Sequence, residues 1–119
     1  MIQPNPLFWA TLEQFVTSSQ IIVDRPKGSL HPRFPNIVYP LDYGFLEGTT
    51  GGDGDGIDVW FGTGESRGVT GVACTADPFK RDAELKILLG CSSQDFATLE
   101  HFFRVTAELP AIIVSRSES

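Results

Sequence analysis

The spacing of hydrophobic residues predicts one helix near the start of the chain and another near its end. The first begins at Asn5-Pro6, a pair typical of a helix cap followed by the first helical position, and covers about residues 6–18. The second begins after Ser92, whose side chain can cap it. Both carry an apolar face: Phe8, Leu12, Phe15 and Val16 in the first, Phe96, Leu99, Phe102 and Phe103 in the second.

Short apolar runs between these helices predict strands. Two short extended pieces on either side of Pro40 follow an irregular, proline-rich loop. Five or so short strands with two flanking helices favour a mainly β fold of the small-barrel type over alternating βαβ units. At 119 residues the whole chain, 1–119, is expected to form one domain. The strands are expected at 21–23, 57–61, 68–75, 84–89 and 111–114, the extended pieces at 37–39 and 43–45, and the loop at 25–36.

Net charge and composition exclude several classes of function. A net charge of −6 without a basic cluster argues against nucleic-acid or acidic-membrane binding, and no apolar run reaches membrane-spanning length. Cys74 and Cys91 form neither a disulfide framework nor a zinc-binding spacing. Without a visible secretory leader, a soluble cytoplasmic protein is expected. The oligomeric state stays open, a homo-oligomer included.

Three carboxylates fall close together in a glycine-rich stretch, at Asp53, Asp55 and Asp58. Glycines allow the backbone to curl these acids toward one point, and oxygen ligands of this kind suit Mg²⁺, with Mn²⁺ as an alternative. Asp58 lies inside an apolar strand, where an unpaired charge is costly. A plain Asp-Gly turn is the other interpretation. A calcium-binding EF-hand loop is excluded, because Ile57 and Gly64 stand at ligand positions.

The acidic stretch and its surroundings resemble the soluble family of inorganic pyrophosphatases. That family has Asp-x-Asp-Pro-x-Asp-Val where this chain has Asp-Gly-Asp-Gly-Ile-Asp-Val at 53–59, preceded by Tyr-Pro-Leu-Asp-Tyr-Gly-Phe at 39–45. Its early Glu-x-Pro corresponds to Asp-Arg-Pro at 24–26, and its His-Phe-Phe to 101–103. Two later aspartates five residues apart match Asp77 and Asp82, each of which alone is typical of a solvated surface. The similarity runs through most of residues 20–104.

The resemblance implies a five-stranded barrel of the OB type and magnesium-dependent hydrolysis of pyrophosphate. It implies that bound metals acidify a water and neutralise the leaving phosphate. The implied metal ligands are Asp53, Asp58 and Asp82 for the principal ion, with Asp58 bridging to a second and Asp77 and Asp24 holding further ions. Asp55 would accept the proton of the attacking water, and Tyr43 would donate a hydrogen bond near it.

The basic groups that bind the substrate in the family are largely missing. The family's Tyr-Lys pair in the last helix is replaced by Thr106-Ala107, and Glu84 stands where a lysine is expected. Lys27, His31 and Arg33 could contact phosphate instead, although an ordinary basic surface loop is the alternative. Further candidates for substrate contact are Tyr39 and Lys86, although a surface position is favoured for Lys86, as for Lys80 and Arg81.

Three hypotheses therefore follow from the sequence. The first is a magnesium-dependent pyrophosphate hydrolase. The second is a non-catalytic barrel that binds metal or phosphate, and the third is a hydrolase of another small phosphoanhydride or phosphate ester. No serine or cysteine lies in a nucleophile motif, and no glycine-rich loop followed by lysine indicates nucleotide binding.

Overall fold

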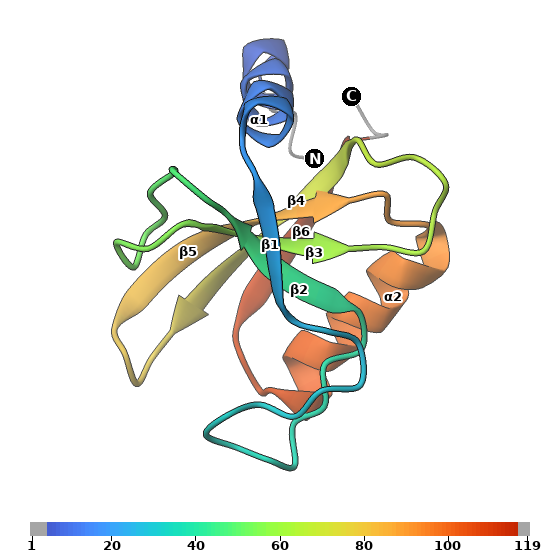
Figure 1. Cartoon of the computed structure of the whole chain (residues 1–119). Helices are drawn as coiled ribbons and strands as arrows, with labels where there is room; N and C mark the ends of the chain where they lie inside the picture. Colours follow the sequence, from blue (N-terminus) through green and yellow to red (C-terminus); the bar gives the residue numbers. More distant parts are fainter. Residues whose placement is uncertain (1–4, 117–119) are drawn as a thin grey trace.

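The computed structural model describes residues 5–116 and consists of a twisted six-stranded sheet with two α-helices (Figure 1). The start of the chain, where no secretory leader is expected, lies partly outside this range. The strand order is β1-β2-β3-β5-β4-β6, and β3 pairs with β5 in parallel while every other pair is antiparallel. The strands are β1 (Ile21–Arg25), β2 (Asp42–Leu46), β3 (Ile57–Phe61), β4 (Val69–Asp77), β5 (Asp82–Leu89) and β6 (Ala111–Ser115).

The mainly β architecture is confirmed, but the closed five-stranded barrel is not shown. The sheet has six strands, and within residues 5–116 its end strands β1 and β6 pair with their inner neighbours only. The reason lies at β4, which pairs with β5 along one edge and with β6 along the other. Because β6 occupies that outer edge, β1 has no free edge of β4 on which to close the sheet.

Both predicted helices are present, and their caps explain where they begin. In α1 (Pro6–Ser18) the side chain of Asn5 accepts a hydrogen bond from the backbone N–H of Leu7. In α2 (Ser93–His101) Ser92 and Asp95 form a reciprocal capping box. A π-helical segment, η1 (Phe102–Thr106), continues α2 and was not predicted. Within residues 5–116 no helix combines the length and hydrophobicity needed to cross a membrane.

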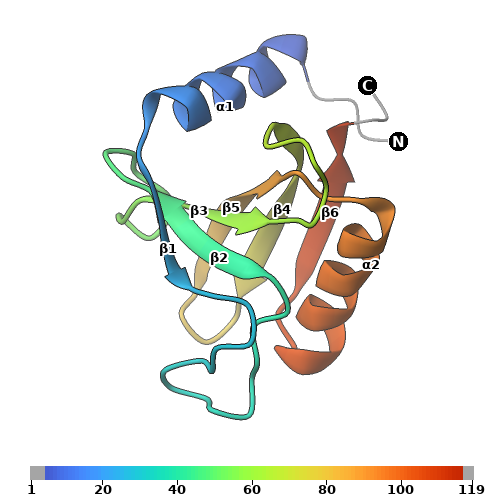
Figure 2. The same ribbon diagram turned by 45° about the vertical axis from the view of Figure 1, so that its right-hand side comes forward.

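The two helices cover opposite faces of the sheet, as Figure 2 shows. Neighbouring residues of a strand point to opposite faces, so β3 contributes to both. Val59 packs in the hydrophobic cluster that contains Trp9 and Leu12 of α1, whereas Trp60 packs in the cluster that contains Leu99 of α2 and Phe102. Trp9 in one cluster and Trp60 in the other are both almost fully buried. Each face of the sheet therefore has its own hydrophobic core.

On the face of the sheet that α2 covers, charged residues lie next to the apolar core residues of β3 and β5. Trp60 of β3 and Leu88 of β5 are a register pair in the core, and Asp58 and Lys86 stand two residues before them. The period of two places Asp58 and Lys86 on the same face as that pair. The β3–β5 pairing therefore brings charged side chains to the end of a buried apolar surface.

Candidate functional site

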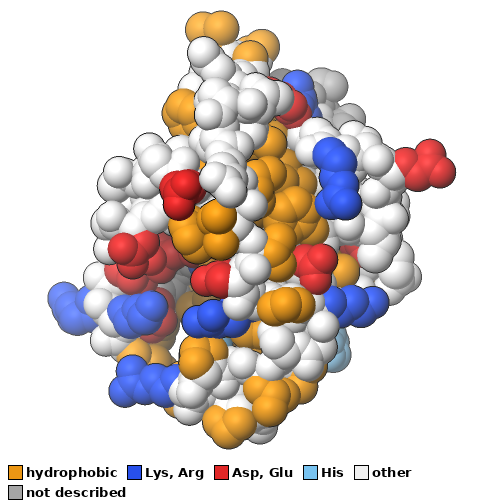
Figure 3. Space-filling model, in the orientation of Figure 1, with side chains coloured by type: hydrophobic (Ala, Val, Ile, Leu, Met, Phe, Trp, Pro, Cys, Tyr) orange, Lys and Arg blue, Asp and Glu red, His pale blue; other side chains and the backbone are white. Residues whose placement is uncertain are grey.

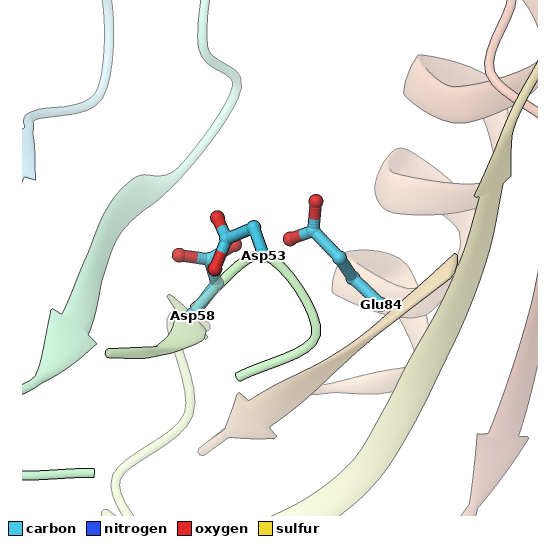
Figure 4. Close-up of side chains that lie close together, drawn as sticks. All are labelled: Asp53, Asp58 and Glu84. Carbon is cyan, nitrogen blue, oxygen red and sulfur yellow. The ribbon is translucent and has the colours of Figure 1, made fainter. Parts of the chain in front are cut away.

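Three carboxylates converge where β3, β5 and the loop between β2 and β3 meet. Asp53, Asp58 and Glu84 each present one oxygen, and these oxygens lie within 4.8 Å of one another. Figure 4 shows Glu84 reaching from β5 toward the two aspartates. The structure thus brings together Asp53 and Asp58, two of the predicted metal ligands. Glu84, which stands where the resemblance implies a lysine, is the third member, and we call the three the acid triad.

Glycine 52 allows the acidic loop to lie directly against β5. A Cβ atom placed on Gly52 would be only 2.4 Å from the carbonyl oxygen of Ala83, the residue before Glu84. No side chain fits at that separation. Within the loop, the backbone N–H of Asp55 donates to the carboxylate of Asp53 at 3.0 Å, which forms a local turn. The loop therefore holds Asp53 beside Glu84 through backbone approach and turn geometry together.

The ammonium group of Lys86 lies inside this acidic region. Its Nζ is 2.9 Å from Asp58 Oδ2, 3.4 Å from Glu84 Oε1 and 2.9 Å from the hydroxyl oxygen of Tyr43. Lys86 is only 7% exposed, so the surface position favoured from the sequence is wrong. A buried ammonium is tolerated only with charged or hydrogen-bonding partners, and here it has three. The ammonium of Lys86 in turn stabilises the charged carboxylates of Asp58 and Glu84.

Burial and the neighbouring acids control protonation at this end of the sheet. Burial raises the pKa of Tyr43 far above its ordinary value, and the charge of Asp58 raises it further, so its hydroxyl stays protonated. Burial also raises the pKa of Glu84, while the ammonium of Lys86 opposes that rise and Asp58 adds to it. The hydroxyl of Tyr43 is therefore a neutral hydrogen-bonding group, beside carboxylates that share one counter-charge.

The donor set of the acid triad fits a hard divalent cation. Mg²⁺ and Ca²⁺ take oxygen ligands at about 2.0–2.6 Å, so ligand atoms on opposite sides of the ion are separated by roughly 4–5 Å. The spacing of the three carboxylate oxygens, within 4.8 Å, is compatible with that separation. Asp58 and Glu84 each have one oxygen on Lys86 and a second oxygen to offer. Asp53 is the most exposed of the three and makes the triad accessible.

A pocket of about 460 Å³ opens over the acid triad and combines both signs of charge. Figure 3 shows, on the left of the view, acidic side chains directly above basic ones. Arg25 and Lys80 line the pocket, although Arg25 had no predicted role and Lys80 was expected on the general surface. An anion in this pocket could contact the basic side chains and a divalent cation held by the carboxylates at the same time. The predicted site residues in this pocket are Asp24, His31, Tyr39, Tyr43, Asp53, Asp55, Asp58 and Lys86.

Two of the predicted substrate contacts have structural roles in the loop between β1 and β2. His31 Nδ1 accepts hydrogen bonds from the backbone N–H groups of Arg33 and Phe34, at 3.0 and 3.2 Å. Burial and the charge of Arg25 lower the pKa of His31, so its ring is neutral at pH 7. Tyr39 is buried and stacks on Tyr43 with ring centroids 5.5 Å apart. The rings of His31 and Tyr39 form part of the wall of the pocket over the acid triad.

Lys27 and Arg33 lie outside the pocket that contains the acid triad. The backbone N–H of Lys27 donates to the carboxylate of Asp42 at 2.8 Å, and its side chain is exposed. The guanidinium of Arg33 lies over the ring of Phe34 and lines a neighbouring pocket of about 470 Å³. The two pockets share several wall residues, among them Tyr43 and Lys86.

The two later aspartates form the ends of the β4–β5 hairpin. Asp77 and Asp82 are the last register pair, and Asp77 Oδ1 accepts hydrogen bonds from the backbone N–H groups of Phe79 and Lys80. These bonds lower the pKa of Asp77, as expected of a turn carboxylate. Neither aspartate lines the pocket over the acid triad. Glu84, and not Asp82, is the third carboxylate beside Asp53 and Asp58.

No family model matches the chain, and no curated protein or solved structure is significantly similar to it. Its likeness to the soluble inorganic pyrophosphatases rests on the motif residues alone.

Proposed function

We propose that the chain is a magnesium-dependent hydrolase of inorganic pyrophosphate that acts in the pocket over the acid triad. One observation supports this most directly: five carboxylates and three basic side chains line the same pocket. Pyrophosphate is small and highly charged, and it needs positive partners on all sides. Basic side chains supply some of them, and cations held by carboxylates supply the others. The carboxylates are Asp24, Asp53, Asp55, Asp58 and Glu84, and the basic side chains are Arg25, Lys80 and Lys86.

In this proposal each side chain has a distinct task. The acid triad would hold the divalent cation, which when bound would neutralise phosphate charge and make a nearby water more acidic. Asp55 lines the pocket outside the triad and would accept a proton from the attacking water. Tyr43, kept protonated by its surroundings, would donate a hydrogen bond to a phosphate oxygen. Arg25 and Lys80 would orient the substrate by charge-assisted contacts.

The fold is compatible with this proposal. The order β1-β2-β3-β5-β4 suits a partly open OB-type barrel to which β6 has been added at the β4 edge. The proposal also includes a cytoplasmic location, in keeping with the two free thiols of Cys74 and Cys91.

A second candidate is a domain that binds metal or phosphate without catalysis. The observation in its favour is Lys86, whose ammonium already occupies two of the three carboxylates. A cluster that carries its own cation can be stable without any hydrolytic role. The two candidates differ in turnover, so a single assay separates them.

The deciding experiment measures phosphate release from pyrophosphate with Mg²⁺, with Mn²⁺ and with EDTA. We expect metal-dependent turnover that Asp55→Asn reduces at least about a hundredfold, the loss typical of a missing proton acceptor, while the metal affinity changes little. Glu65→Gln, an exposed acid outside the pocket, is the control and should retain full activity. Metal binding with phosphate release at the blank level would favour the non-catalytic domain. Release from another phosphoanhydride alone would keep the chemistry and change the substrate.

A further inference from the structure

We infer that the ammonium of Lys86 permanently takes one cation position of the acid triad, so that the site binds one divalent cation where its carboxylates would otherwise accommodate two. This inference rests on the proposed metal site and concerns its stoichiometry. It makes Lys86 a positioning residue that acts through Asp58 and Glu84, in contrast to the substrate contact considered from the sequence.

The contacts of Lys86 are those of a fixed counter-ion. Its Nζ lies 2.9 Å from Asp58 Oδ2 and 3.4 Å from Glu84 Oε1, and its side chain is 9% exposed. A third partner, the hydroxyl of Tyr43, fixes the ammonium from another side at 2.9 Å. A lysine held by three partners at this depth does not swing out to meet a ligand in solvent without leaving the carboxylates uncompensated.

The charge of the cluster supports a single ion. Three carboxylates and one ammonium leave two net negative charges, which one divalent cation balances. A second divalent cation would bring an excess of positive charge next to a buried ammonium, and like charges at this distance repel strongly. Within the triad, Lys86 contacts Asp58 and Glu84 but not Asp53. The divalent cation would therefore bind on the side of Asp53, toward the loop between β2 and β3.

The test uses Lys86→Met, which retains the unbranched shape and removes the charge. Without metal this variant should melt below the wild type, because Asp58 and Glu84 lose their counter-ion. Mn²⁺ should raise its melting temperature by more than it raises that of the wild type. In equilibrium dialysis the wild type should bind one Mn²⁺ per chain. Lys86→Met should bind a second ion, or the first with an affinity at least about tenfold higher.

Two further variants keep the test informative if Lys86→Met folds poorly. Glu84→Gln combined with Lys86→Met restores the net charge of the cluster, and should recover the metal-free stability while still binding one Mn²⁺. Arg104→Met removes a cation of the same charge from an exposed pair with Glu100, and should leave Mn²⁺ binding unchanged.

The outcomes separate the inference from the proposed function. A wild type that binds Mn²⁺, with unchanged stoichiometry and affinity in Lys86→Met, would overturn the inference and leave the metal site standing. Binding in Lys86→Met alone would overturn the inferred stoichiometry of one cation per native chain, because the ammonium would then exclude every divalent cation. Absence of Mn²⁺ binding in both proteins would overturn both.

Discussion

The ammonium of Lys86 donates a 2.9 Å hydrogen bond to the hydroxyl oxygen of Tyr43, which lies 43 residues earlier in the chain. The same nitrogen lies 5.4 Å from the centroid of the Tyr43 ring. Because the hydroxyl oxygen accepts this bond, its own proton can be donated to a carboxylate, and a hydrogen bond with Asp58 helps to raise the pKa of Tyr43. Tyr43 thus joins the buried cation to the open part of the pocket.

Tyr43→Phe should destabilise the protein and weaken turnover together. Removing one acceptor of a buried ammonium should lower the free energy of unfolding by roughly 1.5–3 kcal/mol, measured in urea. The alkaline side of the pH–rate profile should be unaltered, because the raised pKa of Tyr43 keeps its hydroxyl protonated at ordinary pH. Tyr39→Phe, in the same aromatic stack but without the Lys86 contact, is the control. A Tyr43→Phe protein as stable as the wild type would contradict this account.

Asp95→Ala should be among the more destabilising substitutions outside the pocket. The buried carboxylate of Asp95 accepts hydrogen bonds from the backbone N–H groups of Thr63 and Ser92, at 2.7 and 2.9 Å, and from the Thr63 hydroxyl. It joins the start of α2 to the β3–β4 connection. Its loss should cost about 2–4 kcal/mol in urea unfolding, since two backbone donors lose a charged acceptor. Ser93→Ala, at an exposed neighbouring position, should cost little.

The same carboxylate predicts how stability depends on pH. Burial of Asp95 acts to raise its pKa, but the hydrogen bonds from Ser92 and Thr63 outweigh burial and hold the pKa below the ordinary value of 3.8. A folded-state pKa below the unfolded one means that the stabilisation is present above pH 3.8 and disappears as the pH falls through the lower, folded value. Asp95→Asn should therefore lose less stability than the wild type on acidification below pH 3.8. Parallel curves for the two proteins would refute this.

Gly52→Ala should weaken metal binding more than it weakens the fold. The added Cβ would clash with the carbonyl oxygen of Ala83, so the loop must move away from β5 and carry Asp53 away from Glu84. We expect the Mn²⁺ affinity to fall at least about tenfold, as for the loss of one charged ligand contact. Gly51→Ala, in the same loop, is the control, because its added Cβ would lie 3.4 Å or more from the neighbouring atoms, an ordinary van der Waals distance. Equal effects of both on Mn²⁺ binding would count against the loop placement.

Asp77→Ala should lower the melting temperature and leave metal affinity unchanged within about twofold. Its carboxylate closes the β4–β5 turn through the backbone of Phe79 and Lys80; it lines the neighbouring pocket and is not a member of the acid triad. The resemblance implied that Asp77 is a metal ligand. Mn²⁺ titration of Asp77→Ala therefore decides between a metal-binding role and a role in the turn alone. A large loss of Mn²⁺ affinity would restore the role that the resemblance implied.

Local signals in the sequence were sufficient for the elements and for part of the site. Asn5 and Ser92 mark helix starts because capping involves near neighbours in the chain. Asp53 and Asp58 were predicted to converge because only four residues separate them, two of which are flexible glycines. The order of the strands and the extra pairing of β6 were not predictable in this way, since they depend on contacts between distant segments.

Glu84 and Lys86 show why the rest of the site was missed. From residue type alone, Glu84 is interpreted as the replacement of a substrate-binding lysine, and Lys86 as a surface lysine. Their actual environment depends on β5 lying parallel to β3, which no spacing within either strand reveals. Arg25 joins the pocket in the same way, because β1 pairs with β2 and so reaches the pocket wall.

The parallel pairing of β3 with β5 also determines when the site can exist during folding. Glu84 stands beside Asp58 only once β5 has paired with β3, and the chain reaches that pairing through β4, which lies on the other side of β5. Such long-range closure is slow, and the acidic loop alone offers only part of the ligand set until then. A divalent cation should consequently slow unfolding and leave the refolding rate almost unchanged, as stopped-flow kinetics with and without Mn²⁺ would record. Cation binding would then report that β3 and β5 have paired.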